Sequence, residues 1–146
     1  MDFPELIADF AARHNVEGLA AEDGTAALDI DGIVVALASA GDRLDATAEI
    51  GDPPADGAAI FADLLLEAGM ESEAVFVKDR ETGRYLLLRR LYLPRLDPET
   101  FDTALENLVN LAETWRHLLA DFRPAAKAAA ENTPPPAFGA GPFMQV

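Results

Sequence analysis

The chain has 146 residues, 50% hydrophobic and 25% charged, a composition that predicts one globular domain with a core of its own. Its formal net charge at pH 7 is −15, a potential that repels nucleic-acid phosphates and the headgroups of anionic membranes. The chain has no cysteine, which excludes disulfides, thiol catalysis and cysteine metal sites.

The N-terminal stretch predicts an amphipathic helix that ends near Asn15, before Gly18. Pro4 suits its first turn, where a missing backbone N–H costs nothing. The stretch has neither the basic start nor the apolar core of a signal peptide, so we expect a cytoplasmic protein. Its apolar residues recur at helical spacing and are Phe3, Leu6, Ile7, Phe10 and Ala11.

Three strands are predicted next. Leu28 and Ile30 alternate with acidic residues, which is typical of a half-buried strand. Gly32 then turns the chain into residues 33–38, which are apolar at every position and therefore predict a central strand. Residues 44–50 alternate again and predict the third strand.

A second helix is predicted after the proline-containing segment 51–57, with Asp56 as its N-cap and Gly69 at its end. Its apolar residues cover more than the single stripe that a helix needs to pack on one core. We therefore expect it to pack on two sides, on its own sheet and on a partner. These apolar residues are Ile60, Phe61, Leu64, Leu65 and Leu66.

Residues 74–77 and 85–88 flank a glycine-containing loop and predict a hairpin. A third helix follows, with Asp97 as N-cap and Pro98 at its first position, and with Leu96 and Phe101 spaced to form a hydrophobic staple. It should run over about 24 residues, or about 36 Å. Its apolar stripe is Phe101, Leu105, Leu108, Ala112, Trp115, Leu119 and Phe122.

The predicted fold is therefore α+β, with the order α-β-β-β-α-β-β-α, an antiparallel sheet of about five strands and three helices. Residues 1–122 should form this domain, and residues 123–146 an appended tail rich in alanine, proline and glycine. Phe138, Phe143 and Met144 in the tail are candidates to occupy an apolar groove of the domain itself.

The acidic residues are concentrated in the first half of the chain. Residues 1–77 contain 17 acidic and 2 basic residues, whereas residues 78–146 contain 9 of each. The excess negative charge therefore belongs to the first helix, the first three strands and the second helix.

The sequence offers no clear catalytic, cofactor or metal site, and we expect a protein that is not an enzyme. His14 and His117 lie on different predicted helices without a metal-binding spacing, and read as polar residues at helix edges. Ser39 and Ser72 lack the surroundings of a nucleophilic serine. Residues 29–32 resemble the start of a calcium loop but lack its remaining oxygen ligands.

The remaining functional candidate is a surface. The first helix can form a groove beside a sheet edge, and such edges accept an extended peptide through backbone hydrogen bonds. The residues expected to line this client-binding groove are Leu6, Ile7, Phe10, Leu28 and Ile30. For the three residues on the helix, packing in the domain's own core is an equal alternative, because one side chain can do both.

The segment 91–119 carries a family resemblance. It contains Leu93-Pro94 at a turn, Leu96-Asp97 at a helix start, Leu105-Glu106, and the run 111–116. With the element order and the acidic small size, it resembles the class I type III secretion chaperones, the family that includes the Tir chaperone and CesT/SycE-like proteins. The similarity covers residues 3–122.

The resemblance implies a homodimer in a bacterial cytoplasm, with an interface at the second helix formed by Ile60, Phe61, Leu64 and Leu65. It also implies that the N-terminal segment of a secreted effector binds in extended form and stays soluble and secretion-competent, without ATP or another cofactor. The alternative is a non-secretory regulatory or adaptor protein that binds a folded partner with the same fold. A small-molecule enzyme would need a deep pocket with converging polar groups.

Overall fold

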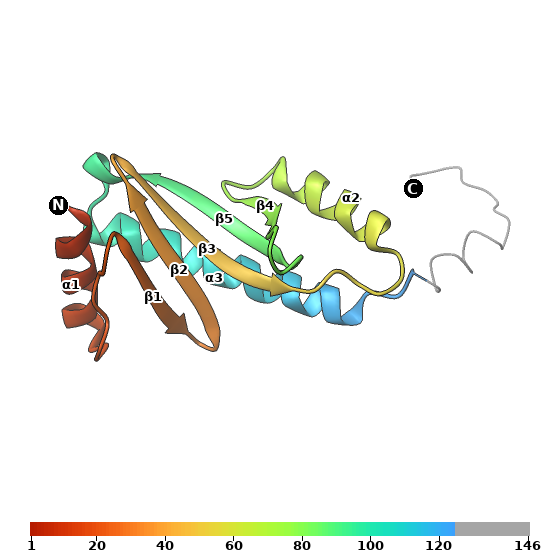
Figure 1. The fold of residues 1–146 in the computed structure, drawn as a ribbon, viewed down its shortest axis with the longest axis horizontal. Coiled ribbons are helices and arrows are strands. Elements are labelled where there is room, and N and C mark those ends of the chain that lie inside the picture. The colour runs from red at the N-terminus through yellow and green to blue at the C-terminus, as the bar shows by residue number, and fades with distance from the viewer. Residues whose placement is uncertain (125–146) are drawn as a thin grey trace, which may run out of the picture.

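The computed structural model describes residues 1–124, and the α+β element order is as predicted (Figure 1). Phe138, Phe143 and Met144 of the predicted tail lie outside the described residues. The elements are α1 (Phe3–His14), β1 (Thr25–Ile30), β2 (Ile33–Ala40), β3 (Arg43–Gly51), α2 (Ala58–Gly69), β4 (Val75–Lys78), β5 (Tyr85–Tyr92), a short 3-10 helix (Leu93–Arg95) and α3 (Pro98–Asp121).

Within the described residues, five strands form one antiparallel sheet in the order β1-β2-β3-β5-β4. The central position predicted for residues 33–38 is confirmed, because β2 lies between β1 and β3. The strand is nevertheless buried on one face only. Val35 and Leu37 are buried, whereas Val34 on the opposite face is 52% exposed. Its continuous apolar run therefore does not mean burial on both faces.

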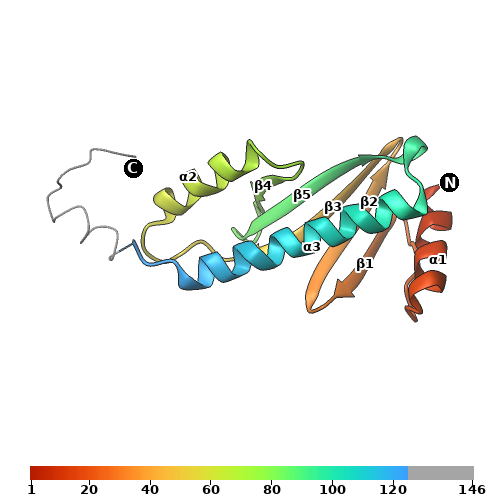
Figure 2. The ribbon, with the colours of Figure 1, turned by 180° about the vertical axis from the view of Figure 1, so that it is seen from behind.

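The helices pack on the inner face of the sheet. α3 runs along it against β2, β3 and β5, and Figures 1 and 2 show it behind and in front of the strands, respectively. α1 lies beside the start of α3, where the rings of Phe10 and Phe101 are 5.6 Å apart. α2 lies beside the other end, where Phe61 contacts Trp115 and Phe122 at ring distances of 5.8 and 5.1 Å. α3 thus joins both outer helices into one core.

The predicted start of α3 is confirmed. The Asp97 side chain accepts a hydrogen bond from the Thr100 backbone N–H at 2.7 Å, and this bond holds the pKa of Asp97 below its ordinary value. Leu96 and Phe101 are both buried, as a hydrophobic staple requires. α1 has a further cap that we did not predict, a reciprocal capping box between Asp2 and Glu5.

The predicted N-cap of α2 is wrong. The helix begins at Ala58, and its N-cap is Gly57 with φ of 79° and no side-chain cap, not Asp56. A Cβ atom at Gly57 would lie 2.5 Å from Pro124, so the chain that follows α3 passes directly over this position. A contact between segments far apart in sequence therefore selects glycine here.

The predicted hairpin is confirmed with different bounds. β4 is shifted by one residue, and β5 extends to Tyr92 because β3 pairs along its whole length. Arg90 in the extension binds Asp45 on β3 at 2.7 Å. Among residues 1–124, no helix is long and apolar enough to span a bilayer.

Candidate functional site: an apolar groove beside a free sheet edge

A groove of about 450 Å³ lies between the end of α1, the second half of β1 and the first half of α3. Its apolar lining comes from all three elements and from the loop after α1. These residues are Phe10, Val16, Leu28, Ile30, Leu105 and Val109. Its polar residues include His14, Asp29, Asp31, Asp102, Glu106 and Asn110. The site is thus an apolar trough with a polar rim.

Three of the five residues predicted for the groove lie in its lining, namely Phe10, Leu28 and Ile30. Leu6 and Ile7 do not, because they point into the core and are 0% and 1% exposed. The alternative of core packing therefore holds for all three helix residues, because Phe10, although it borders the groove, is also buried at 7% exposed. Binding of a client by Phe10, Leu28 and Ile30 remains a prediction.

The backbone of β1 is free beyond Thr25 on the side that faces away from β2. Thr25 and Glu22 exchange backbone hydrogen bonds of 2.9 and 2.8 Å on that side, and backbone groups alternate along a strand. Ala27 and Asp29 therefore direct their N–H and C=O groups to the same side. Since β1 is an end strand and no further strand of the described chain pairs there, these groups are available to a guest.

The turn between β1 and β2 gives independent support for this register. It has two residues, Asp31 and Gly32, both with positive φ (53° and 85°), as a type I′ hairpin turn requires. The flanking pair Ile30 and Ile33 is then hydrogen-bonded, which again directs the backbone N–H and C=O of Asp29 away from β2. The Asp29 side chain accepts a bond from the Gly32 N–H at 2.8 Å and so stabilises the turn.

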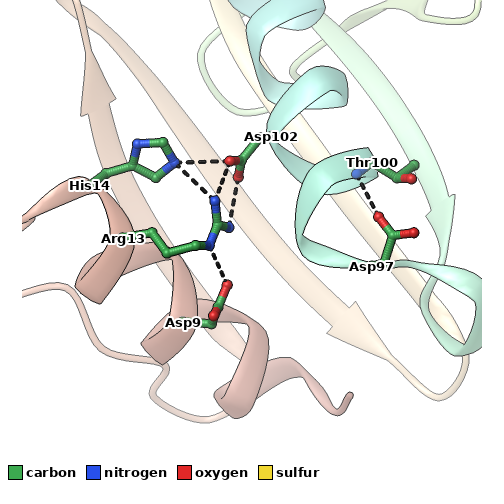
Figure 3. Close-up of polar contacts among 6 residues, drawn as sticks. All are labelled: Asp9, Arg13, His14, Asp97, Thr100 and Asp102. Carbon is green, nitrogen blue, oxygen red and sulfur yellow. Dashed lines mark hydrogen bonds and ion pairs between the residues drawn. The ribbon is translucent and has the colours of Figure 1, made fainter.

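An ionic cluster joins α1 to α3 at the rim of the groove (Figure 3). Arg13 binds Asp9 at 2.6 Å and makes two bonds to Asp102, one of them at 3.0 Å. His14 lies 3.0 Å from the same carboxylate. These bonds fix where the end of α1 sits relative to α3, and so help to set the width of the groove.

The pKa of Asp102 lies below its ordinary value, first because of the hydrogen bond from Arg13. A carboxylate whose pKa is depressed in the folded state stabilises the fold at pH values above its unfolded-state pKa of about 3.9. This stabilisation is lost as the pH falls through the folded-state pKa. We expect Asp102→Asn to lower the free energy of unfolding by about 1 kcal/mol at pH 7, since the cluster is partly exposed.

Urea denaturation at several pH values would measure this effect. The difference between wild type and Asp102→Asn should shrink below pH of about 4, because the wild-type carboxyl is then protonated. Glu113→Gln, an exposed charge removal on the same helix, is the matched control and should change little. A difference that stays constant from pH 7 to pH 3 would contradict the assignment.

The predicted interface on α2 divides into two sets. Phe61 and Leu65 are 1% and 4% exposed and pack inward, whereas Leu64 is 41% exposed and Ile60 half-buried. Leu66 and Met70, which we did not place in the interface, are the most exposed apolar residues there, at 67% and 87%. The helix therefore has apolar residues on both its buried and its exposed sides. Its contribution to a dimer remains a prediction. The sequence predicted that more than one side of this helix is apolar, but it did not predict which side faces outward.

No metal centre accompanies the groove within the described residues. No group of three or more His, Cys, Asp or Glu side chains in residues 1–124 is placed to hold a metal ion. His14 belongs to the ionic cluster, and His117 is exposed on α3.

Comparisons with known proteins gave a match to a family model and solved structures of similar fold. The family model described as the Tir chaperone protein (CesT) family matches residues 5–116. A chain of the ExsC–ExsE complex is similar with a TM-score of 0.71 and 26% identity, over 82% of this chain and 97% of that chain. Comparison with curated protein sequences gave no match.

Two further solved structures share the fold. A chain of the HopA1–SchA chaperone–effector complex has a TM-score of 0.66 and 19% identity, over 77% of this chain and 91% of that chain. The Yersinia pestis structure of the type III secretion chaperone SycH with a stable fragment of YscM2 gives 0.63 and 23%, over 78% of this chain and 99% of that chain.

Proposed function

Because this chain belongs to the Tir chaperone protein (CesT) family, we propose that it is a type III secretion chaperone for an effector's N-terminal segment. It binds that segment in extended form and keeps the effector soluble and secretion-competent. The proposal assigns no catalytic step, ATP or other cofactor to the chain. It places the protein in the bacterial cytoplasm, where effectors are held before export.

The observation that carries this proposal is the apolar groove beside the free edge of β1. A guest strand pairs with the backbone of Ala27 and Asp29, which satisfies its own backbone polar groups. Its alternate side chains then point to the inner face, where Phe10, Ile30 and Val109 line the groove. Backbone pairing supplies affinity that tolerates different client sequences, and the groove supplies selection of apolar residues.

The second part of the proposal is a homodimer that uses the outer side of α2. Leu66 on α2 and Met70 at its C-cap are exposed and four positions apart, hence on one side of the helix end, and Val75 on the neighbouring strand β4 is 48% exposed. Leu64 is exposed on another side of the helix. Exposed apolar side chains of this kind are typical of an interaction surface. Phe61 and Leu65 are buried on the opposite, inner side of α2 and hold the helix on its own domain. Two grooves per dimer would let one effector segment extend over both protomers.

The alternative of a regulatory or adaptor protein has less support. That reading requires a surface shaped for a folded partner, whereas the groove lies beside the unpaired backbone groups of an end strand. The groove suits one extended chain. We therefore retain only the chaperone proposal.

The test is co-expression of the full chain with an effector encoded beside its gene. We expect a stable complex of two chaperone copies and one effector by size-exclusion chromatography with light scattering. Deleting the effector's N-terminal segment should abolish the complex, because the rest of the effector makes no contact with the groove. An effector that binds equally well without this segment would exclude the proposal, and a one-to-one complex would exclude the dimer.

A further inference from the structure

The polar rim of the groove is acidic. Asp29, Asp31, Asp102 and Glu106 all line it, and no lysine or arginine of the described chain does. These four residues come from β1, the turn after it and α3, so the groove has carboxylates on both of its long sides. A purely apolar guest would lie between these charges without using them.

The four carboxylates differ in how far the protein itself neutralises them. Asp102 is bound by Arg13. Asp29 accepts one hydrogen bond from the Gly32 N–H. Asp31 and Glu106 are exposed, and within residues 1–124 no ion pair joins Asp29, Asp31 or Glu106 to a basic side chain. Three negative charges at the rim are therefore uncompensated.

The charge of the surrounding chain has the same sign. Residues 1–77 carry 17 acidic against 2 basic residues and supply α1, β1 and the turn after it. A negative field of this kind attracts cationic segments from a distance and repels acidic ones, within a Debye length of about 10 Å at 0.1 M salt. The negative field and the carboxylates at the rim thus both favour a cationic guest.

We propose that the groove selects client segments in which lysine or arginine alternates with apolar residues, an inference that rests on the proposed function. In a strand paired to β1, residues opposite Ala27 and Asp29 point to the outer face of the sheet. A basic residue there reaches Asp29 and Asp31, while its neighbours fill the apolar groove. A basic residue at the end of the segment, in a position that points to the inner face, meets Glu106 on α3.

Three labelled synthetic peptides test this selection by fluorescence anisotropy with the full chain. All three have the same alternating valine and leucine positions, and the residues between them are all lysine, all glutamine or all glutamate. In 50 mM salt we expect the lysine peptide to bind at least tenfold more tightly than the glutamate peptide. In 500 mM salt this preference should fall to about twofold, since the charges are screened.

Charge-removing variants then locate the effect. Asp31→Asn with Glu106→Gln should weaken the lysine peptide on the order of tenfold and leave the glutamine peptide unchanged. Asparagine is well tolerated at positive φ, so the turn at Asp31 is retained. Asp23→Asn with Glu113→Gln is the matched control, because Asp23 also has positive φ and Glu113 lies on α3. Equal losses in both double variants would mean a general effect of net charge and would overturn the proposal.

The glutamine peptide separates this inference from the proposed function. Ile30→Thr keeps a β-branched residue in β1 and removes apolar lining, so it should weaken all three peptides. If it does so while lysine and glutamine peptides bind equally, the groove binds clients and the charge selection is wrong. If no peptide binds and the chain also fails to hold an effector, both proposals are wrong. Failure of the peptides alone counts against the charge selection.

Discussion

Replacing Phe61 by alanine should lower the free energy of unfolding by about 3–5 kcal/mol, the usual range for a fully buried phenylalanine. Phe61 is 1% exposed and holds α2 on the domain through three other aromatic rings. Its ring lies 5.8 Å from Tyr85, 5.8 Å from Trp115 and 5.1 Å from Phe122. No single neighbour can fill the cavity that the substitution leaves, because the rings are held by β5 and by α3 with its C-cap.

Urea denaturation followed by tryptophan fluorescence would measure this loss, since Trp115 is the only tryptophan and contacts Phe61. Leu66→Ala on the same helix is the matched control. Leu66 is 67% exposed, so in the monomer its truncation should change the free energy of unfolding by less than about 1 kcal/mol. Dimer dissociation contributes to apparent stability, and both variants should therefore be compared at the same low protein concentration. Equal losses would contradict the orientation of α2.

Replacing Ile30 by aspartate should weaken effector binding by a hundredfold or more. The change removes apolar contact of about 1.5–3 kcal/mol and sets a carboxylate in a trough that the client would dehydrate, at a further cost of about 1–3 kcal/mol. About 1.4 kcal/mol corresponds to a tenfold change in affinity. Ile30 is only partly buried in the free protein, so the domain itself should still fold.

Val34→Asp provides the matched control for this prediction. Val34 lies on β2, next to the strand that carries Ile30, and pairs with Asp29, but its side chain points to the outer face and is 52% exposed. The same charge is thus introduced nearby without entering the groove. Binding measured by isothermal titration calorimetry should not weaken, because the new carboxylate joins Asp29 on the outer face, where basic residues of the client are expected. Similar losses in both variants would place the client elsewhere on the sheet.

The elements that could be predicted most fully are those specified by neighbouring residues. The start of α3 depends on Asp97, Pro98 and the staple between Leu96 and Phe101, all within six consecutive residues. Capping and stapling involve residues a few positions apart, so they can be recognised without knowing the rest of the fold. The start of α2 could not be predicted in this way, because Gly57 is selected by Pro124 from the far end of the chain.

The candidate site was predictable only in part, for the same reason. Helical spacing places Leu6, Ile7 and Phe10 on one stripe of α1, and it cannot tell which of them will border the groove. The ionic cluster was not foreseen, because Arg13 and Asp102 are far apart in the sequence and meet only when α1 packs on α3. The acidic rim of the groove arises in the same way, from β1, its turn and α3.

The sequence by itself determined the order and class of the elements, the negative charge of the first half, and the surplus of apolar surface on α2. Only the tertiary structure decided that Phe61 and Leu65 face inward while Leu66 and Met70 face outward, and that the edge of β1 is free beside the groove. The physical reason is that periodicity and capping act over a few residues. The partner of a side chain, in contrast, depends on which distant segment packs against it.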